Sequence, residues 1–144
     1  MIAVILISAG VFALCAVLRR RLSGSAPHFL FRDKIQLDPM YNRGAAFGLK
    51  LKGPVLNVLS AAALGMLALL AASARGLMAR LGAGLALGGG LSNLYERLRG
   101  RGVLDYLRFP RLLGRGKRLV FNAADLAIFA GLLLMLLDGG KKGK

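Results

Sequence analysis

The sequence predicts an all-α membrane protein with four transmembrane helices and a small β element at the membrane surface. Hydrophobic residues make up 56% of the 144 residues, and the mean hydropathy of +0.61 is well above that of a usual soluble domain. The apolar residues gather in four runs, each near the ~20 residues that a helix needs to cross a ~30 Å hydrocarbon core. The runs cover residues 2–18, 54–74, 77–95 and 119–137. No linker separates them, so we expect residues 1–144 to form a single integral-membrane domain.

The first run has its positive charges after the apolar stretch, at residues 19–21. A secretory signal peptide carries them before it, so we expect this run to be a transmembrane helix. The second and third runs are joined by a connection too short for anything but a helical hairpin. All four runs are expected to be helical, because only helices and closed barrels satisfy backbone polar groups in lipid.

Two long connections, residues 19–53 and 96–118, are the places for structure outside the membrane. Alternating apolar and polar residues over 31–37 predict a short strand or hairpin at the membrane surface. Pro39 and Gly44 are expected to mark turns after it.

The chain is strongly basic, with 21 Lys and Arg residues against six acidic ones and a net charge of +15. Because the basic residues lie between apolar runs, we expect anionic membrane lipids as partners and no nucleic acid. Sixteen of the 21 basic residues fall in the two long connections, and the positive-inside rule would place both connections in the cytoplasm.

The chain has one cysteine, Cys15, and one histidine, His28. A zinc site normally takes three or four Cys, His or carboxylate ligands, so no metal site is expected. An internal disulfide is excluded, and His28 has no supporting motif for Ser-His-Asp catalysis.

Two of the acidic residues stand out by their position. Asp105 follows the third run, and Asp125 lies six residues into the fourth run, where a carboxylate costs about 2.5–3.5 kcal/mol on insertion scales. One loop joins the two runs, so both aspartates can reach the same side of the membrane. Asn122 precedes Asp125 by three positions, so the two residues share a helix face and Asn122 can orient the carboxyl group of Asp125. The other carboxylates near the surface, Asp33, Asp38 and Asp138, are expected to be solvated or interfacial.

Two close carboxyl groups in a low-dielectric site share a proton, so one can act as general base on water while the other acts as general acid. From residue types alone, two alternatives stay open. A buried acid could pair with a base such as Arg97 and serve only helix packing, or the acids could line a proton or substrate pathway in a transporter.

Four ordered motifs narrow these alternatives. They are NRGAAFG at 42–48, GGGLSNLYERL at 88–98, GVLDYL at 102–107 and FNAADLAI at 121–128. Together they resemble lipoprotein signal peptidase (signal peptidase II), a bacterial membrane aspartyl protease family with four transmembrane helices. The resemblance covers nearly the whole chain.

The resemblance implies a membrane aspartic endopeptidase that removes the signal peptide from prolipoproteins just before a diacylglyceryl-modified cysteine. Asp105 and Asp125 match the family's catalytic aspartates, which we call the aspartate dyad, and no metal or organic cofactor is involved. The expected location is the bacterial cytoplasmic membrane, with several spans and the dyad near the outer face, as a monomer. That orientation is opposite to the one given by the count of basic residues. Asn42 matches a polar residue that lines the family's substrate site, and three further residues match those around the dyad: Asn93, Arg97 and Asn122.

Three further residues are expected to support the site. Gly44 would permit a tight backbone turn, and Phe47 would contact the signal peptide or acyl chains. Glu96 stands where the family usually has Asp, beside Arg97.

The chain departs from the family pattern at two other places. Ser92 stands where Gly is common, and the first run lacks the aspartate that family members often carry late in it. The second departure supports one alternative, a catalytically inactive relative that binds lipidated peptides or lipids. A small four-helix transporter is the weaker alternative. Such transporters carry an essential glutamate in the first helix, where this chain has no acidic residue.

Overall fold

Four long helices and a three-stranded antiparallel sheet make up the computed structural model, which describes residues 1–31, 34–44, 53–110 and 119–139. The helices occur where the four apolar runs predicted them, with shifted ends. They are α1 (Ile2–Leu22), α2 (Gly53–Ala72), α3 (Leu77–Leu98) and α5 (Ala123–Gly139). The strands are β1 (His28–Leu30), β2 (Ile35–Asn42) and β3 (Val103–Arg108).

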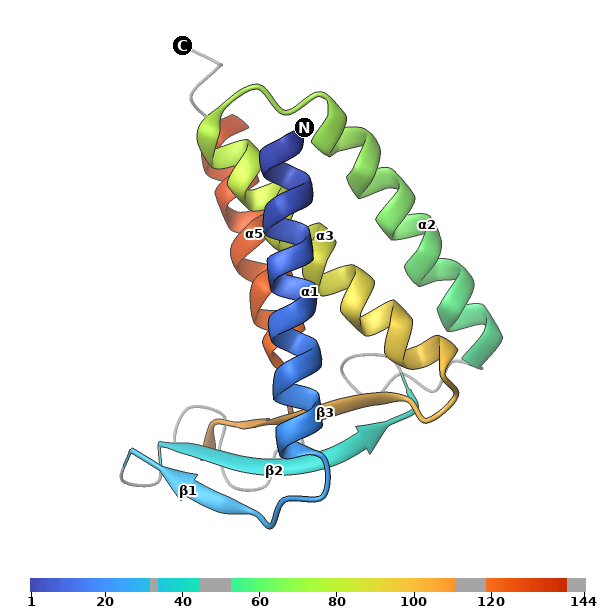
Figure 1. The fold of residues 1–144 in the computed structure, drawn as a ribbon, viewed down its shortest axis with the longest axis vertical. Coiled ribbons are helices and arrows are strands. Elements are labelled where there is room, and N and C mark those ends of the chain that lie inside the picture. The colour runs from blue at the N-terminus through green and yellow to red at the C-terminus, as the bar shows by residue number, and fades with distance from the viewer. Residues whose placement is uncertain (32–33, 45–52, 111–118, 140–144) are drawn as a thin grey trace.

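Helix α3 is the centre of the bundle and contacts α1, α2 and α5 (Figure 1). Its glycines bring the neighbouring backbones close, as expected for small residues at helix contacts. A Cβ atom on Gly88 would lie 2.6 Å from the Ser8 carbonyl oxygen of α1, and one on Gly89 would lie 2.5 Å from the Ala124 carbonyl oxygen of α5. The Ser8 hydroxyl donates a hydrogen bond to the Gly84 carbonyl oxygen at 3.0 Å and ties α1 to α3 further along.

The sheet lies across one end of the helix bundle in the order β1-β2-β3 (Figure 1). The β element expected in the first long connection is confirmed by β1 and β2, and β3 from the second long connection adds a third strand by pairing with β2. The two connections therefore form one sheet, and both lie at the same end of the bundle. The connection between α2 and α3 lies at the opposite end, with the N-terminus.

Of the strand or hairpin predicted over residues 31–37, the hairpin is observed, and its two strands extend beyond these bounds. Phe31 has a φ of 52° and stands between β1 and β2, so this segment spans a change of direction. Pro39 lies within β2 and does not end it; the register against β3 shifts between Leu37 and Met40. Proline lacks an N–H group, and an irregularity of this kind tolerates it. The bend at Gly44 follows β2, as expected.

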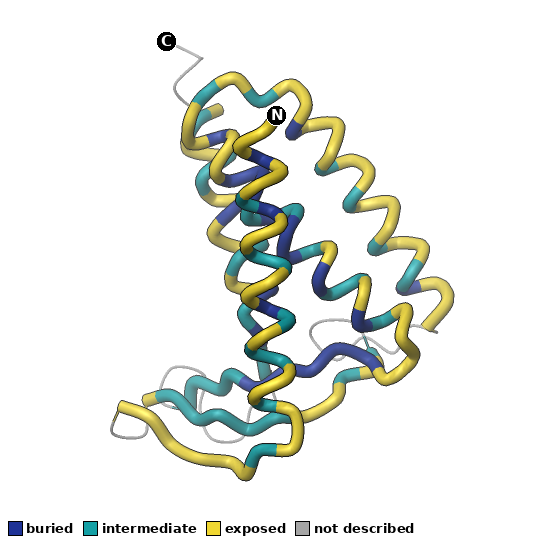
Figure 2. The backbone as a smooth tube through the Cα atoms, in the orientation of Figure 1, coloured by how far each residue is buried: buried dark blue, intermediate teal, exposed yellow. Residues whose placement is uncertain are grey.

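The burial pattern separates the helices (Figure 2). Much of α3 is buried, whereas α2 exposes most of its surface, including large side chains such as Val58 and Leu69. Helices α1 and α2 are long and apolar enough to cross a membrane, and only 17% and 11% of their most apolar windows are buried. Large exposed apolar surfaces of this kind are typical of helices that face lipid.

Candidate active site

Asp125 lies in the first turn of α5, at the third helical position. The prediction that it lies six residues inside a helical span is therefore wrong, because α5 begins at Ala123 and not at residue 119. The Asp125 N–H donates to Asn122 Oδ1 and the Asn122 N–H donates to Asp125 Oδ2, each at 3.0 Å. This reciprocal pair is a capping box, and it satisfies backbone donors that the helix leaves free. The positive end of the helix dipole favours a negative charge at this position.

Asp105 lies in β3 opposite Met40 of β2, and only 5% of it is exposed. Both of its oxygens accept hydrogen bonds at 2.9 Å, Oδ2 from Asn42 Nδ2 and Oδ1 from Asn122 Nδ2. Burial raises the pKa of Asp105 to about 6, against an ordinary value of 3.8. The charge of Asp125 also raises this pKa, whereas the two amide donors and Arg97 lower it.

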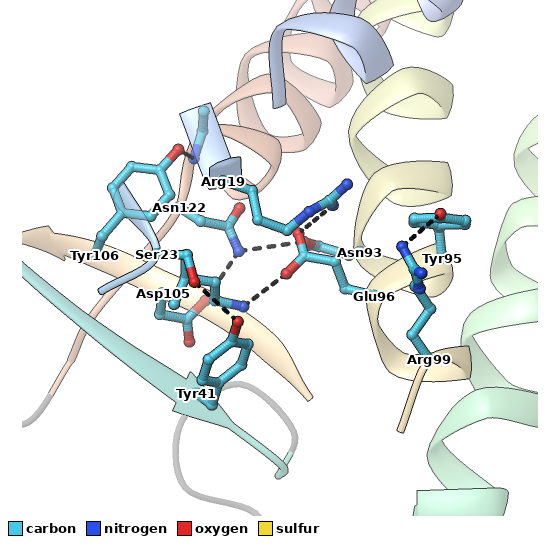
Figure 3. A network of polar contacts seen from close by, with 12 residues as sticks. Arg19, Ser23, Tyr41, Asn93, Tyr95, Glu96, Arg99, Asp105, Tyr106 and Asn122 are labelled. Atoms are coloured by element: carbon cyan, nitrogen blue, oxygen red, sulfur yellow. Dashed lines mark hydrogen bonds and ion pairs between the residues drawn. The ribbon is translucent and has the colours of Figure 1, made fainter. Parts of the chain in front are cut away.

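The two aspartates are joined through Asn93 and Asn122, which we call the asparagine pair. Asn122 Nδ2 donates to Asn93 Oδ1 at 3.2 Å as well as to Asp105, and Asn93 Nδ2 donates to Asp125 Oδ1 at 2.8 Å. Figure 3 shows Asn122 directed toward both Asn93 and Asp105. The asparagine pair thus fixes a carboxyl group on β3 relative to one on α5.

The segment after β2 is held by two of the other expected residues. Asn42 Oδ1 accepts the Gly44 N–H, and the Gly44 carbonyl oxygen accepts a hydrogen bond from Arg97 Nη1, both at 2.9 Å. The alternative in which Arg97 forms an ion pair with a buried acid is not observed: in the described part of the chain, the ion pairs are Arg19–Glu96 and Arg108–Asp38. Phe47 lies outside the described residues.

Glu96 connects three elements behind the dyad. Its Oε2 atom accepts the Leu104 N–H of β3 at 2.8 Å, and its Oε1 atom lies 3.0 Å from Arg19 Nη1 of α1. Arg19 Nη1 is buried and not aligned for a hydrogen bond, so the contact is electrostatic. Because Leu104 precedes Asp105, the chain Arg19–Glu96–Leu104 positions the strand that carries the aspartate. Sequence reasoning did not identify Arg19 as part of the site, because its pairing with Glu96 depends on the packing of α1 against α3.

Tyr106 is a second residue that sequence reasoning did not identify. Its hydroxyl oxygen accepts the Ala123 N–H at 3.0 Å, and its own N–H donates to the Phe121 carbonyl oxygen at 2.9 Å. Burial raises the pKa of Tyr106 to about 12, so the hydroxyl group stays neutral. These bonds tie β3 to the start of α5, which sets the spacing of the two aspartates.

The described residues contain no group of three or more His, Cys, Asp and Glu side chains that could hold a metal ion. The chemistry available at the site is that of two carboxyl groups surrounded by amide donors and one guanidinium group. Such a site can hold one proton between its carboxyl groups and exchange it with a bound water.

Comparisons with known proteins give the family and the fold of this chain. The family model of signal peptidase (SPase) II matches residues 2–139. The lipoprotein signal peptidase of Halothermothrix orenii is 35% identical over 122 residues, which cover 83% of this chain and 78% of that protein. The lipoprotein signal peptidase of Nitrobacter hamburgensis is 34% identical over 106 residues, covering 68% of this chain and 64% of that protein. A bacterial membrane enzyme solved in meso at 2.3 Å has the same fold, with a TM-score of 0.81 and 21% identity over 98% of this chain and 91% of that one.

Proposed function

Because the chain belongs to the signal peptidase II family, we propose that it removes the signal peptide from diacylglyceryl-modified prolipoproteins, with Asp105 and Asp125 as its catalytic groups. The family marks the chain as a membrane protein and a protease, and it supports cleavage of lipoprotein signal peptides. The aspartic mechanism is our inference from the geometry of the site.

The observation that carries this inference is the asparagine pair, because it bonds to both aspartates at once. In the proposed reaction one aspartate is ionised and the other is protonated. The ionised carboxylate takes a proton from a water molecule, whose oxygen attacks the scissile carbonyl carbon, while the protonated one donates its proton to the carbonyl oxygen. We assign that proton to Asp105, because the capping box and the helix dipole at the start of α5 favour the ionised form of Asp125. When the tetrahedral gem-diol collapses, the C–N bond breaks and the carboxyl group that took a proton from water gives it to the amide nitrogen. The other carboxylate takes a proton back from one of the two hydroxyl groups, which leaves a carboxylic acid product and restores the dyad.

The surrounding residues position the dyad in this proposal. Asn42, Asn93 and Asn122 hold the carboxyl groups, and Glu96 holds the strand before Asp105. Arg97 and Gly44 fix the segment after β2, and Phe47 stays a proposed contact for the signal peptide or acyl chains.

We further propose that α1, α2, α3 and α5 all cross the bacterial cytoplasmic membrane, with the dyad near its outer face and the enzyme acting as a monomer without cofactor. A lipid-modified substrate can then reach the site laterally through the bilayer. The count of basic residues at the sheet end favours the reverse orientation. We give the outer position more weight, because the substrates of such a peptidase are cut after translocation.

The test is cleavage of a diacylglyceryl-modified prolipoprotein, followed as a gel shift in membranes that lack endogenous signal peptidase II. Asp105→Asn and Asp125→Asn keep side-chain size and remove the acid, and each is expected to lower the rate by roughly 10³-fold or more. Asp138→Asn, at the far end of α5, is the matched control and should cut normally.

Cleavage by either dyad variant at more than a tenth of the wild-type rate would refute the assignment of the two aspartates. Failure of the wild type on several prolipoproteins would instead favour the inactive relative that binds lipidated peptides without cutting them.

A further inference from the structure

A second polar site lies beside the dyad, at the same end of the bundle. It is a cavity of about 580 Å³, and six of its lining residues are Arg19, Arg20, Ser23, Tyr41, Arg99 and Arg101. We call it the basic pocket. Glu96 also lines it, but neither aspartate of the dyad and neither member of the asparagine pair does. Figure 3 shows Arg19, Glu96, Arg99 and Tyr41 approaching this region from three different elements.

The charges of the basic pocket do not balance. Glu96 is its one acidic lining residue, and the carboxylate is already engaged by Arg19 and by the Leu104 N–H. Among the described residues, Arg20, Arg99 and Arg101 make no ion pair. Three guanidinium groups therefore share a pocket without a compensating carboxylate, which favours binding of an anion.

The aromatic ring of Tyr95 brings two of the cations together. The Cζ atoms of Arg19 and Arg99 each lie 5.4 Å from the centre of this ring, and Arg99 Nη1 donates to the Tyr95 hydroxyl at 3.0 Å. The ring–cation contacts hold the planar guanidinium groups in fixed positions. The hydroxyl groups of Ser23 and Tyr41, which also line the pocket, lie 3.3 Å apart and can hydrogen-bond a polar ligand.

Exposed apolar side chains adjoin the pocket. Val17 is 48% exposed and lies on the same face of α1 as Arg20, three positions earlier, and Leu98 is 65% exposed and directly precedes Arg99. The pocket also lies at the end of α1, one of the two helices apolar enough to span a membrane. A ligand with an anionic head and an apolar tail would fit both features.

We propose that the basic pocket binds the phosphate of an anionic phospholipid headgroup, with the acyl chains along the exposed faces of α1 and α3. Arginine forks bind phosphate through paired hydrogen bonds, and basic pockets at a membrane surface attract anionic headgroups. This site is separate from the peptidase proposal, since it uses residues outside the dyad and requires no cleavage.

The experiment compares two double variants by native mass spectrometry of the detergent-purified protein, titrated with phosphatidylglycerol or with phosphatidylcholine. Arg20→Gln with Arg101→Gln alters the pocket, and Arg21→Gln with Arg75→Gln removes the same charge outside its lining. None of these four side chains makes a hydrogen bond or ion pair among the described residues, so all variants should fold. Thermal unfolding checks this, and the single variants Arg101→Gln and Arg21→Gln replace any pair that does not fold.

Phosphatidylglycerol is expected to bind at least tenfold more weakly to the pocket variant than to the wild type. Its affinity for the control variant should lie within about twofold of its affinity for the wild type. Phosphatidylcholine should bind more weakly than phosphatidylglycerol to the wild type. Equal losses in both double variants would overturn the proposal, because surface charge alone would then explain binding. Competition by inorganic phosphate at equal concentration would also overturn it, in favour of a site for a soluble anion.

Discussion

The aspartate dyad and the basic pocket lie side by side at the sheet end of the bundle, with Glu96 contributing to both. Around the dyad, each carboxyl oxygen accepts a hydrogen bond from an amide or backbone N–H group. In the pocket, three arginines have no carboxylate partner among the described residues. The hydrogen bonds hold the carboxyl groups of the dyad in fixed positions, whereas the unpaired positive charges of the basic pocket attract an anion. The fold therefore places a rigid site beside a positively charged one.

The largest expected effect comes from opening the closed network at Asn122. Asn122→Ala removes the side-chain hydrogen bonds to Asp105 and Asn93 and the cap of α5, whereas the backbone N–H of residue 122 can still donate to Asp125. The rate of prolipoprotein cleavage should fall roughly 10²- to 10³-fold. Asn122→Asp keeps a capping oxygen but loses the amide donor, so it separates capping from positioning of the dyad. Asn57→Ala in α2 is the matched control. A loss below threefold for both Asn122 variants would show that the asparagine pair is not needed.

A smaller effect is expected at the boundary, where Glu96 pairs with Arg19. Glu96→Gln keeps an acceptor for the Leu104 N–H but leaves Arg19 with no opposite charge, and the free energy of unfolding should fall by about 2 kcal/mol. The estimate is below that for a fully buried pair, because 19% of the Arg19 side chain is exposed. Denaturant titration in mixed micelles measures the change. Arg19→Gln combined with Glu96→Gln should recover part of the loss; no recovery would mean that the pair does not interact.

The titration of Asp105 is expected to change the free energy of unfolding with pH, by an amount similar to the effect of Glu96→Gln. Its pKa is about 6 in the folded protein against an ordinary 3.8, so the folded state binds the proton more tightly than the unfolded state does. Stability from this group is complete below pH 3.8 and is lost as the pH rises through about 6, a total of about 3 kcal/mol at 1.36 kcal/mol per pKa unit. Asp105→Asn removes this dependence. The melting temperature of the variant relative to wild type should therefore increase between pH 4 and pH 7, and parallel curves would contradict the shift.

The smallest effect concerns the second ion pair, between Asp38 of β2 and Arg108 of β3. Its atoms are 3.1 Å apart, and the side chains are 23% and 27% exposed. Solvent screens such a pair, so Asp38→Asn should lower the free energy of unfolding by less than about 1 kcal/mol, and less still at high salt. A loss as large as that for Glu96→Gln would show that the two ion pairs do not differ in their contribution to stability.

Hydropathy and motif spacing predicted much of the fold. Four helices occur at the four apolar runs, and the glycines of the third run lie at close helix contacts. Asp105 and Asp125 are brought together by Asn122, which the sequence had placed beside Asp125 by helical periodicity. These features are local, or they follow from the length of a segment in lipid, so composition and spacing suffice to predict them.

Other features depended on contacts between distant segments. Pairing of β2 with β3 places Asn42 against Asp105, 63 positions away, and no alternation in either segment specifies that register. The predicted start of the fourth helix was too early, because Leu119 to Phe121 are apolar enough to continue a span. In the structure Phe121 pairs with Leu107 and Asn122 caps the helix.

The sequence by itself determined the four helices, the family and the residue types of the dyad. The tertiary structure alone decided that Arg19 meets Glu96, that Tyr106 supports the start of α5 and that four arginines line one pocket. The length of an apolar run and the periodicity of a helix are local properties of the chain, so the sequence alone reveals them. The direction and partner of a polar side chain are set by the packing of elements from different parts of the chain, because a buried charge is stable only where the fold supplies its counterpart.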